Sequence, residues 1–132
     1  MKVLSLTEPF ATLIKENKKC IETRSWKTSY RGELFIHASS TKPNYESKPN
    51  DFKKLFENYD LNFGNIICKC QLVDCIYMTK EYVENMKKNN YQEYLCGEYK
   101  VGRYAWILED IQPLDNPIKA KGHLSIWNYD EE

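Results

Sequence analysis

The chain has 132 residues, 42% of them hydrophobic, which is enough for one compact core and too few to argue for two domains. Its 19 Lys and Arg residues balance 19 Asp and Glu residues, and this zero net charge excludes the long-range basic field that drives tight binding to long duplexes. No apolar run is long enough to span a membrane, and the N-terminal apolar stretch is too short for a secretory signal. Five cysteines are an odd number, which favours a reducing compartment over a disulfide framework. We therefore expect a cytoplasmic protein with no membrane partner.

The N-terminal part of the chain is predicted to contain a strand, a helix and two further strands. Residues 3–6 form the first strand, after which Thr7 can cap a helix that Asn17 ends in a left-handed conformation. Residues 19–26 and 33–38 have the alternating side chains of strands and flank a turn.

The predicted strand 19–26 carries opposite charges on one face. Successive side chains on a strand point to opposite sides, so Glu22, Arg24 and Trp26 share a side. They offer a hydrogen-bond acceptor, a planar donor fork and a stacking surface, which suits a flat ligand such as a base or nucleoside. The alternative is that Glu22 and Arg24 pair with each other, or with charges around the next strand, because exposed ion pairs are common.

The charges are unevenly spread along the chain. Residues 15–31 contain six Lys or Arg and two Glu, whereas the C-terminus closes with Asp130-Glu131-Glu132. A basic patch beside an anionic tail suits a small phosphate-bearing ligand or a single strand more than a long polyanion, although a solvated charged face has the same pattern.

The rest of the chain is predicted to be mainly strands with short helices between them. In chain order the pattern predicts a polar loop at 39–50, a helix at 51–59, a long apolar strand at 66–78, a helix from Thr79 to Lys88, a strand at 103–111 and a final docking element at Ile126 and Trp127. Strands and helices do not alternate as in a parallel α/β protein. The pattern therefore favours an α+β, mainly β fold: a small, mostly antiparallel barrel with short inserted helices.

The cysteines do not predict a metal site. Cys68 and Cys70 lie in the apolar strand pattern with Ile66 and Leu72 on the same face, and the two histidines of the chain are distant from them. Zinc sites normally draw on two cysteine pairs or on Cys and His at finger-like spacings. We therefore expect buried structural cysteines, no metal and no cofactor.

Six segments spread along the chain carry a family resemblance: Ser5-Leu6-Thr7-Glu8-Pro9-Phe10-Ala11, Lys19-x-Ile21-Glu22-x-Arg24-x-Trp26, Arg31-Gly32-x-Leu34-x-Ile36-His37-Ala38, Val73-Asp74-Cys75, Gly102-Arg103-Tyr104-Ala105-Trp106 and Lys121-Gly122 with Trp127. Together they resemble the ASCH domain, named for activating signal cointegrator homology, over nearly the whole chain. The resemblance implies a single domain over 1–132 with a fold like that of the PUA domain, a twisted β-barrel with small helices and a cleft between them.

The resemblance also implies which residues line the cleft. Its polar positions fall on Lys19, Glu22 and Arg24, with Ser5 nearby and Tyr104 from the far strand. Trp26, Arg31 and His37 are further candidates from the strand and turn patterns. The candidate ligand-binding residues are therefore Ser5, Lys19, Glu22, Arg24, Trp26, Arg31, His37 and Tyr104. One departure from the family is Glu8, which replaces the usual glutamine and would repel a phosphate unless it points away.

We predict that such a cleft binds single-stranded or modified RNA, or a nucleoside or nucleotide, by charge and stacking. Other members of the fold imply two hydrolase alternatives. One is an amidohydrolase that acts on N4-acylated cytidine, in which Lys19 would take the lysine position while Glu22 stands where the threonine nucleophile is expected. Glu22 would then act as general base and Lys19 would stabilise an oxyanion. The other is a metal-dependent ribonuclease, and a protein-interaction domain in transcription or translation is the third alternative.

Overall fold

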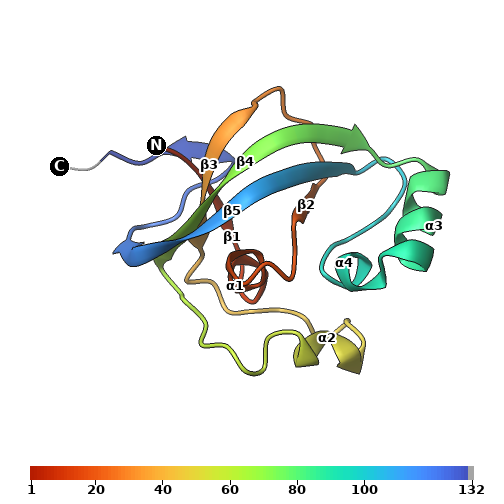
Figure 1. Ribbon diagram of the computed structural model, residues 1–132, viewed down its shortest axis with the longest axis horizontal. Coiled ribbons are helices and arrows are strands. Elements are labelled where there is room, and N and C mark those ends of the chain that lie inside the picture. The colour runs from red at the N-terminus through yellow and green to blue at the C-terminus, as the bar shows by residue number, and fades with distance from the viewer. Residues whose placement is uncertain (131–132) are drawn as a thin grey trace.

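The computed structural model describes residues 1–130, so Glu131 and Glu132 of the predicted acidic tail lie outside the described residues. The strands are β1 (Lys2–Leu6), β2 (Ile21–Arg24), β3 (Gly32–Ala38), β4 (Asn65–Tyr77), β5 (Tyr104–Lys119) and β6 (Ile126–Asn128). They form one sheet in the order β2-β5-β4-β3-β1-β6, curved into a half-barrel (Figure 1). β1 runs parallel to β3 and the other neighbours are antiparallel. The prediction of an α+β, mainly β fold is confirmed.

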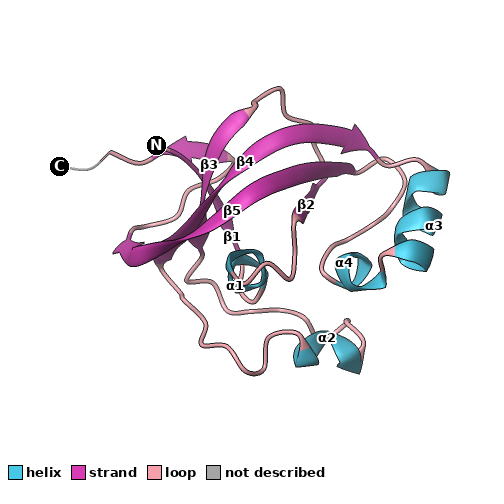
Figure 2. Ribbon diagram, in the orientation of Figure 1, coloured by secondary structure: helices cyan, strands magenta, loops and turns pink. Residues whose placement is uncertain are grey.

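Four short helices lie outside the sheet (Figure 2). They are α1 (Phe10–Lys15), α2 (Asn50–Lys54), α3 (Lys80–Asn89) and α4 (Tyr91–Leu95). Helix α1 packs against β1, β3, β4 and β5, whereas α3 and α4 contact each other near one end of β4 and β5 (Figure 1). None of the helices in residues 1–130 combines the length and apolarity needed to cross a membrane.

The helix boundaries show which local signals were correct. Thr79 caps α3 by accepting a hydrogen bond from the Tyr82 backbone N–H, as predicted. Asn17 has a φ of 61°, also as predicted. Thr7 does not cap α1 with its side chain. The predicted helix 51–59 is shorter than expected, since α2 ends at Lys54 and is followed by turns, and α4 was not predicted.

The Glu8 carboxylate supplies the acceptor that Thr7 was expected to supply. Glu8 is fully buried and accepts a hydrogen bond from the Thr12 backbone N–H at 2.8 Å and another from the Thr12 hydroxyl. It also accepts from the Asn62 backbone N–H at 2.7 Å. Glu8 therefore joins α1 to the chain before β4 and presents no charge to a ligand.

Strand β5 is longer than the prediction of 103–111, because it continues through Pro113 and Pro117. Proline removes a backbone donor and is tolerated where one edge of a strand is free. β2 covers β5 only from Tyr104 to Ile107, so the edge beyond that point has no neighbouring strand among residues 1–130. This edge explains why two prolines can lie within the strand.

The main core lies between the sheet and α1. Its buried members are Leu4, Leu6, Ala11, Ile14, Leu34, Ile36, Ala38, Ile67, Cys68, Cys70, Leu72, Trp106 and Leu108. Cys68 and Cys70 are buried as predicted, and burial raises the pKa of both thiols, that of Cys70 to about 12. Ile66 packs elsewhere, with Val3 and Trp127, because the β4 register shifts between Ile66 and Cys68. In residues 1–130 no group of three His, Cys, Asp or Glu side chains could hold a metal ion.

Candidate functional site

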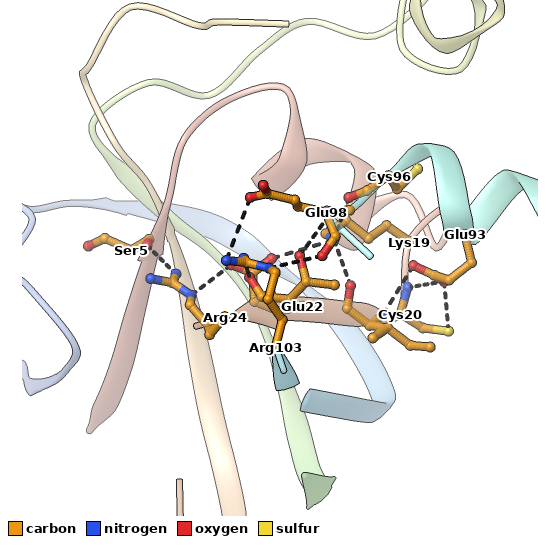
Figure 3. Close-up of polar contacts among 12 residues, drawn as sticks. Ser5, Lys19, Cys20, Glu22, Arg24, Glu93, Cys96, Glu98 and Arg103 are labelled. Carbon is orange, nitrogen blue, oxygen red and sulfur yellow. Dashed lines mark hydrogen bonds and ion pairs between the residues drawn. The ribbon is translucent and has the colours of Figure 1, made fainter. Parts of the chain in front are cut away.

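Strand β2 presents Glu22 and Arg24 on the same side, as the period of two predicts. Their neighbours Ile21 and Thr23 are buried, whereas Glu22 and Arg24 are half-buried. The Glu22 Oε2 atom lies 2.9 Å from Arg24 Nε and its Oε1 atom lies 3.4 Å from Lys19 Nζ. The two residues thus pair with each other, as the alternative interpretation held (Figure 3). They also line a hollow in the surface.

This hollow, here called the charged cleft, has two lobes. Both lobes are lined by Thr7, Phe10, Glu22, Thr23 and Arg103. The larger lobe has a volume of about 540 Å³ and extends to Lys48, Glu98 and Lys100. The smaller lobe, of about 340 Å³, extends to Ser5, Arg24 and Trp26. The charged cleft is therefore large enough for a nucleotide-sized molecule.

The Arg24 side chain is held against the sheet. Its Nη2 atom donates to the Ser5 carbonyl at 3.1 Å, and its guanidinium carbon lies 6.0 Å from the Trp106 ring. Although Nε lies close to Glu22, its N–H is not aligned with that carboxylate and has no hydrogen-bond acceptor within residues 1–130. These contacts fix the guanidinium plane at the wall of the smaller lobe.

A second arginine, Arg103, was missed as a site residue, although it belongs to one of the segments that carried the family resemblance. It donates from Nε to the Glu98 carbonyl at 3.0 Å and from Nη2 to the Thr23 carbonyl at 3.2 Å. A hydrogen bond from Lys100, followed by the charge of Arg103, holds the pKa of the Glu98 carboxyl below its usual value. Figure 3 shows Arg103 between β2 and Glu98.

The loop at 96–103 brings these groups to the cleft. A Cβ atom at Gly97 would lie 2.8 Å from side-chain atoms of Thr23 and Tyr99, so glycine permits this close packing. The Thr23 hydroxyl accepts a hydrogen bond from the Glu98 backbone N–H at 3.0 Å. The loop therefore lies directly on β2, although 75 residues separate Thr23 from Glu98.

Lys48 was also missed as a site residue. It comes from the polar loop 39–50, and its ammonium donates to the Gly97 carbonyl at 2.8 Å. The same ammonium lies 6.0 Å from the Phe10 ring and 5.6 Å from the Phe52 ring. Burial, followed by the charge of Lys19, lowers the pKa of Lys48. The only sequence signal was the position of this loop, because such loops often border sites.

Lys19 does not line the charged cleft, contrary to the prediction. Its side chain is 1% exposed, and its ammonium donates to the Ile21 carbonyl at 2.6 Å and to the Cys96 carbonyl at 2.7 Å. Lysine is rarely buried, which is why the sequence pattern suggested an exposed group. The buried Lys19 ammonium instead forms an ion pair with the Glu22 carboxylate, which does line the cleft.

His37, a further candidate for ligand binding, is buried and lies outside both lobes of the cleft. Its Nε2 atom lies 2.7 Å from the Ala120 carbonyl, which can only accept, so Nε2 carries the proton. Its Nδ1 atom then accepts from the Ser5 hydroxyl at 2.9 Å, and Trp127 Nε1 donates to the same Ser5 oxygen at 3.0 Å. A Cβ at Gly122 would lie 3.0 Å from the His37 ring. This network joins β1, β3 and β6, and only Ser5 reaches the cleft.

Of the remaining candidates, Trp26 lines the cleft, whereas Arg31 and Tyr104 do not. Trp26 lies beyond the end of β2, is 36% exposed, and packs edge-on against Trp106 while lining the smaller lobe. Arg31 lies outside both lobes, in a turn where it donates to the carbonyls of Thr28 and Tyr30. Tyr104 also lies outside both lobes and packs edge-on against Tyr77. The structure thus brings together Ser5, Glu22, Arg24 and Trp26 and leaves out Lys19, Arg31, His37 and Tyr104.

We expect the Cys20 thiol to react slowly with alkylating agents. Glu93 accepts from the Cys20 backbone N–H at 2.8 Å and from its thiol at 3.2 Å. Partial burial, followed by the charge of Glu93, raises the pKa of Cys20 from 9.0 to about 12, and only the thiolate is nucleophilic. Mass spectrometry after iodoacetamide treatment at pH 8 should show alkylation at least about tenfold slower than that of glutathione. Glu93→Gln should accelerate it, and a Cys20 as reactive as glutathione would contradict this account.

The sequence profile of the ASCH domain matches residues 4–118, which is most of the chain. The chain belongs to the ASCH domain family. It is 25% identical over 133 residues to activating signal cointegrator 1 of Mus musculus and 25% identical over 131 residues to that of Homo sapiens. Each alignment covers 98% of this ASCH domain chain and 22% of the relative, so the chain spans about a fifth of the length of these proteins.

Solved ASCH structures share the fold. The crystal structure of ASCH from Zymomonas mobilis has a TM-score of 0.57 and 22% identity, covering 89% of this chain and 72% of that chain. A mutant of the same protein has a TM-score of 0.56 and 20% identity, covering 89% and 74%. The ASCH domain is a PUA-like fold that is generally linked to RNA binding.

Proposed function

We propose that the charged cleft binds a nucleotide unit of single-stranded or modified RNA. The observation that carries this proposal is the composition of the cleft walls: four cations, Arg24, Lys48, Lys100 and Arg103, against two carboxylates, Glu22 and Glu98. The surplus of positive charge is local, since the whole chain has no net charge. It suits a phosphate and its neighbouring base more than a long duplex.

The phosphate and the base of a nucleotide each have a matching group in the cleft. The guanidinium groups of Arg24 and Arg103 can donate to phosphate or base oxygens. The Glu22 carboxylate can accept from an exocyclic amine, and Trp26 offers a flat surface on which a base can stack. Glu8, the acid that replaces the usual glutamine of the family, is buried and does not oppose a phosphate.

The hydrolase alternatives have less support from the geometry. Lys19, which would stabilise an oxyanion, is 1% exposed and is already hydrogen-bonded to two carbonyls. Thr23, the residue next to Glu22 in the chain, is buried and its hydroxyl accepts from the Glu98 backbone N–H at 3.0 Å. Incubation with N4-acetylcytidine followed by chromatography tests this alternative, because release of cytidine would show catalysis.

We expect Arg24→Ala to weaken binding of cytidine monophosphate and of a labelled pentaribonucleotide by about tenfold or more, since a hydrogen bond to a charged group contributes about 1.5–3 kcal/mol. Glu22→Gln should weaken binding of bases that carry an exocyclic amine. Titration calorimetry and fluorescence anisotropy measure both, with thermal melting to verify folding. Arg31→Ala is the matched control, because this arginine lies in a turn outside the cleft. Unchanged binding by a folded Arg24→Ala variant would place the ligand elsewhere.

The family link to activating signal cointegrator 1 also leaves a protein-interaction role to be tested. A pull-down from lysate, with and without nuclease, separates the two functions. Loss of the captured material after nuclease supports RNA binding. Protein partners that persist after nuclease, together with no affinity for the RNA probes, would favour the interaction role.

A further inference from the structure

Four tyrosines form a stack beside the charged cleft. Tyr91 and Tyr94 come from α4, Tyr99 from the following loop and Tyr82 from α3. The ring centroids of Tyr91 and Tyr94 are 6.1 Å apart, those of Tyr94 and Tyr99 are 5.7 Å apart, and those of Tyr99 and Tyr82 are 6.5 Å apart. The interplanar angles are 20°, 27° and 21°, so the rings are nearly parallel. We call these residues the tyrosine stack.

One end of the tyrosine stack is open to solvent. Tyr99, inside the stack, is 6% exposed, whereas Tyr91 at its end is 46% exposed. Tyr91 and Tyr94 line a hollow of about 360 Å³ together with Lys48, Lys87 and Lys100. A large aromatic ring that remains half-exposed at the rim of a hollow can stack with a further flat group.

This hollow adjoins the charged cleft. Lys48, Gly97, Glu98 and Lys100 line both the larger lobe of the cleft and the hollow beside the tyrosine stack. The charged cleft and the hollow that Tyr91 lines therefore share one wall.

The charge of the hollow suits a phosphate backbone. Lys48, Lys87 and Lys100 face one carboxylate, Glu98, which is itself paired with Lys100 at 3.1 Å and Arg103 at 3.6 Å. The Lys87 ammonium lies 5.9 Å from the Tyr94 ring and so adds its charge to the aromatic surface. A basic groove with exposed aromatic rings is typical of surfaces that bind single-stranded nucleic acid.

We propose that the tyrosine stack is a second base-binding position, on which RNA that occupies the charged cleft stacks a neighbouring base against Tyr91. This inference rests on the proposed function and narrows it: the ligand is an RNA segment of at least two nucleotides, in place of a free nucleoside. The lysines of the shared wall contact the phosphate that joins the two nucleotides.

The test compares a pentaribonucleotide with cytidine monophosphate on the full chain. Tyr91→Ala should weaken binding of the pentaribonucleotide by about tenfold, in the range expected for loss of one base stack, and leave cytidine monophosphate binding unchanged. Tyr91→Phe keeps the ring and should retain the affinity for both probes. Tyr77→Ala is the matched control, because Tyr77 is 50% exposed and lies outside the cleft and the hollow.

The outcomes separate the two proposals. If Tyr91→Ala binds the pentaribonucleotide as tightly as the unaltered chain, the second position is overturned while the charged cleft stands. If Tyr91→Phe loses as much affinity as Tyr91→Ala, stacking is not the cause and the inference is again overturned. If Arg24→Ala leaves cytidine monophosphate binding unchanged, the proposed function itself fails.

Discussion

Replacing Lys19 with alanine should lower the free energy of unfolding by about 3–5 kcal/mol, the usual cost of breaking a buried ion pair. The substitution removes the donor from the Ile21 and Cys96 carbonyls and one cation from Glu22. Those carbonyls are buried and cannot turn to water, so their lost hydrogen bonds add to the cost. Glu22 keeps its contact with Arg24, so the cleft wall is expected to remain charged.

Urea denaturation followed by circular dichroism measures this loss. Lys19→Met retains most of the apolar stem and should still lose much of the stability, because the missing element is the ammonium. Lys27→Ala is the matched control at an exposed lysine and should change stability by no more than about 0.5 kcal/mol. A Lys19→Ala variant as stable as the control would show that the buried ammonium contributes nothing.

Replacing Glu8 with alanine should cost about 2–5 kcal/mol, since each buried donor left without an acceptor costs about 1–3 kcal/mol. The variant leaves the backbone N–H groups of Thr12 and Asn62 without their acceptor. It also separates α1 from the segment before β4, two parts of the chain that this carboxylate joins.

Thermal or urea unfolding measures the effect, and Glu16→Ala provides the control. Glu16 is half-buried, 3.7 Å from Lys15, and within residues 1–130 accepts no hydrogen bond from a buried backbone donor, so we expect its pair to contribute about 0–1 kcal/mol. Glu8→Gln restores the residue usual in the family and retains one acceptor oxygen, so its cost should lie between those of Glu8→Ala and Glu16→Ala. Equal stability of the Glu8 and Glu16 alanine variants would refute the structural role.

The two substitutions bear directly on the proposed function. Both residues are charged and lie in segments that carried the family resemblance. From the sequence, Lys19 was predicted to bind a ligand and Glu8 to repel a phosphate unless it points away. The structure instead places their charged atoms among backbone donors and acceptors. The cations that line the charged cleft are Arg24, Lys48, Lys100 and Arg103, and the last three come from loops.

Several features of the structure could be predicted from the conformational preferences of neighbouring residues. The period of two placed Glu22 and Arg24 on one side of β2, because alternation depends only on extended backbone. Thr79 was correctly predicted to begin α3, where its hydroxyl accepts a hydrogen bond from the Tyr82 backbone N–H. Asn17 was correctly predicted to take a left-handed conformation after α1. The apolar pattern of β4 matched its bounds to within one residue at each end. These features need no information from distant parts of the chain.

The sequence by itself thus determined the strand pattern and one wall of the cleft, since both follow from the conformations of neighbouring residues. Only the tertiary structure decided which charges are buried and what forms the opposite wall. Lys19 is buried because the Cys96 carbonyl, 77 residues away, accepts a hydrogen bond from its ammonium, and Lys48 reaches the cleft because the Gly97 carbonyl, 49 residues away, accepts one from the Lys48 ammonium. These two lysine–carbonyl hydrogen bonds form only when the loops pack over the sheet. The packing of the whole chain decides this arrangement, and local propensity does not.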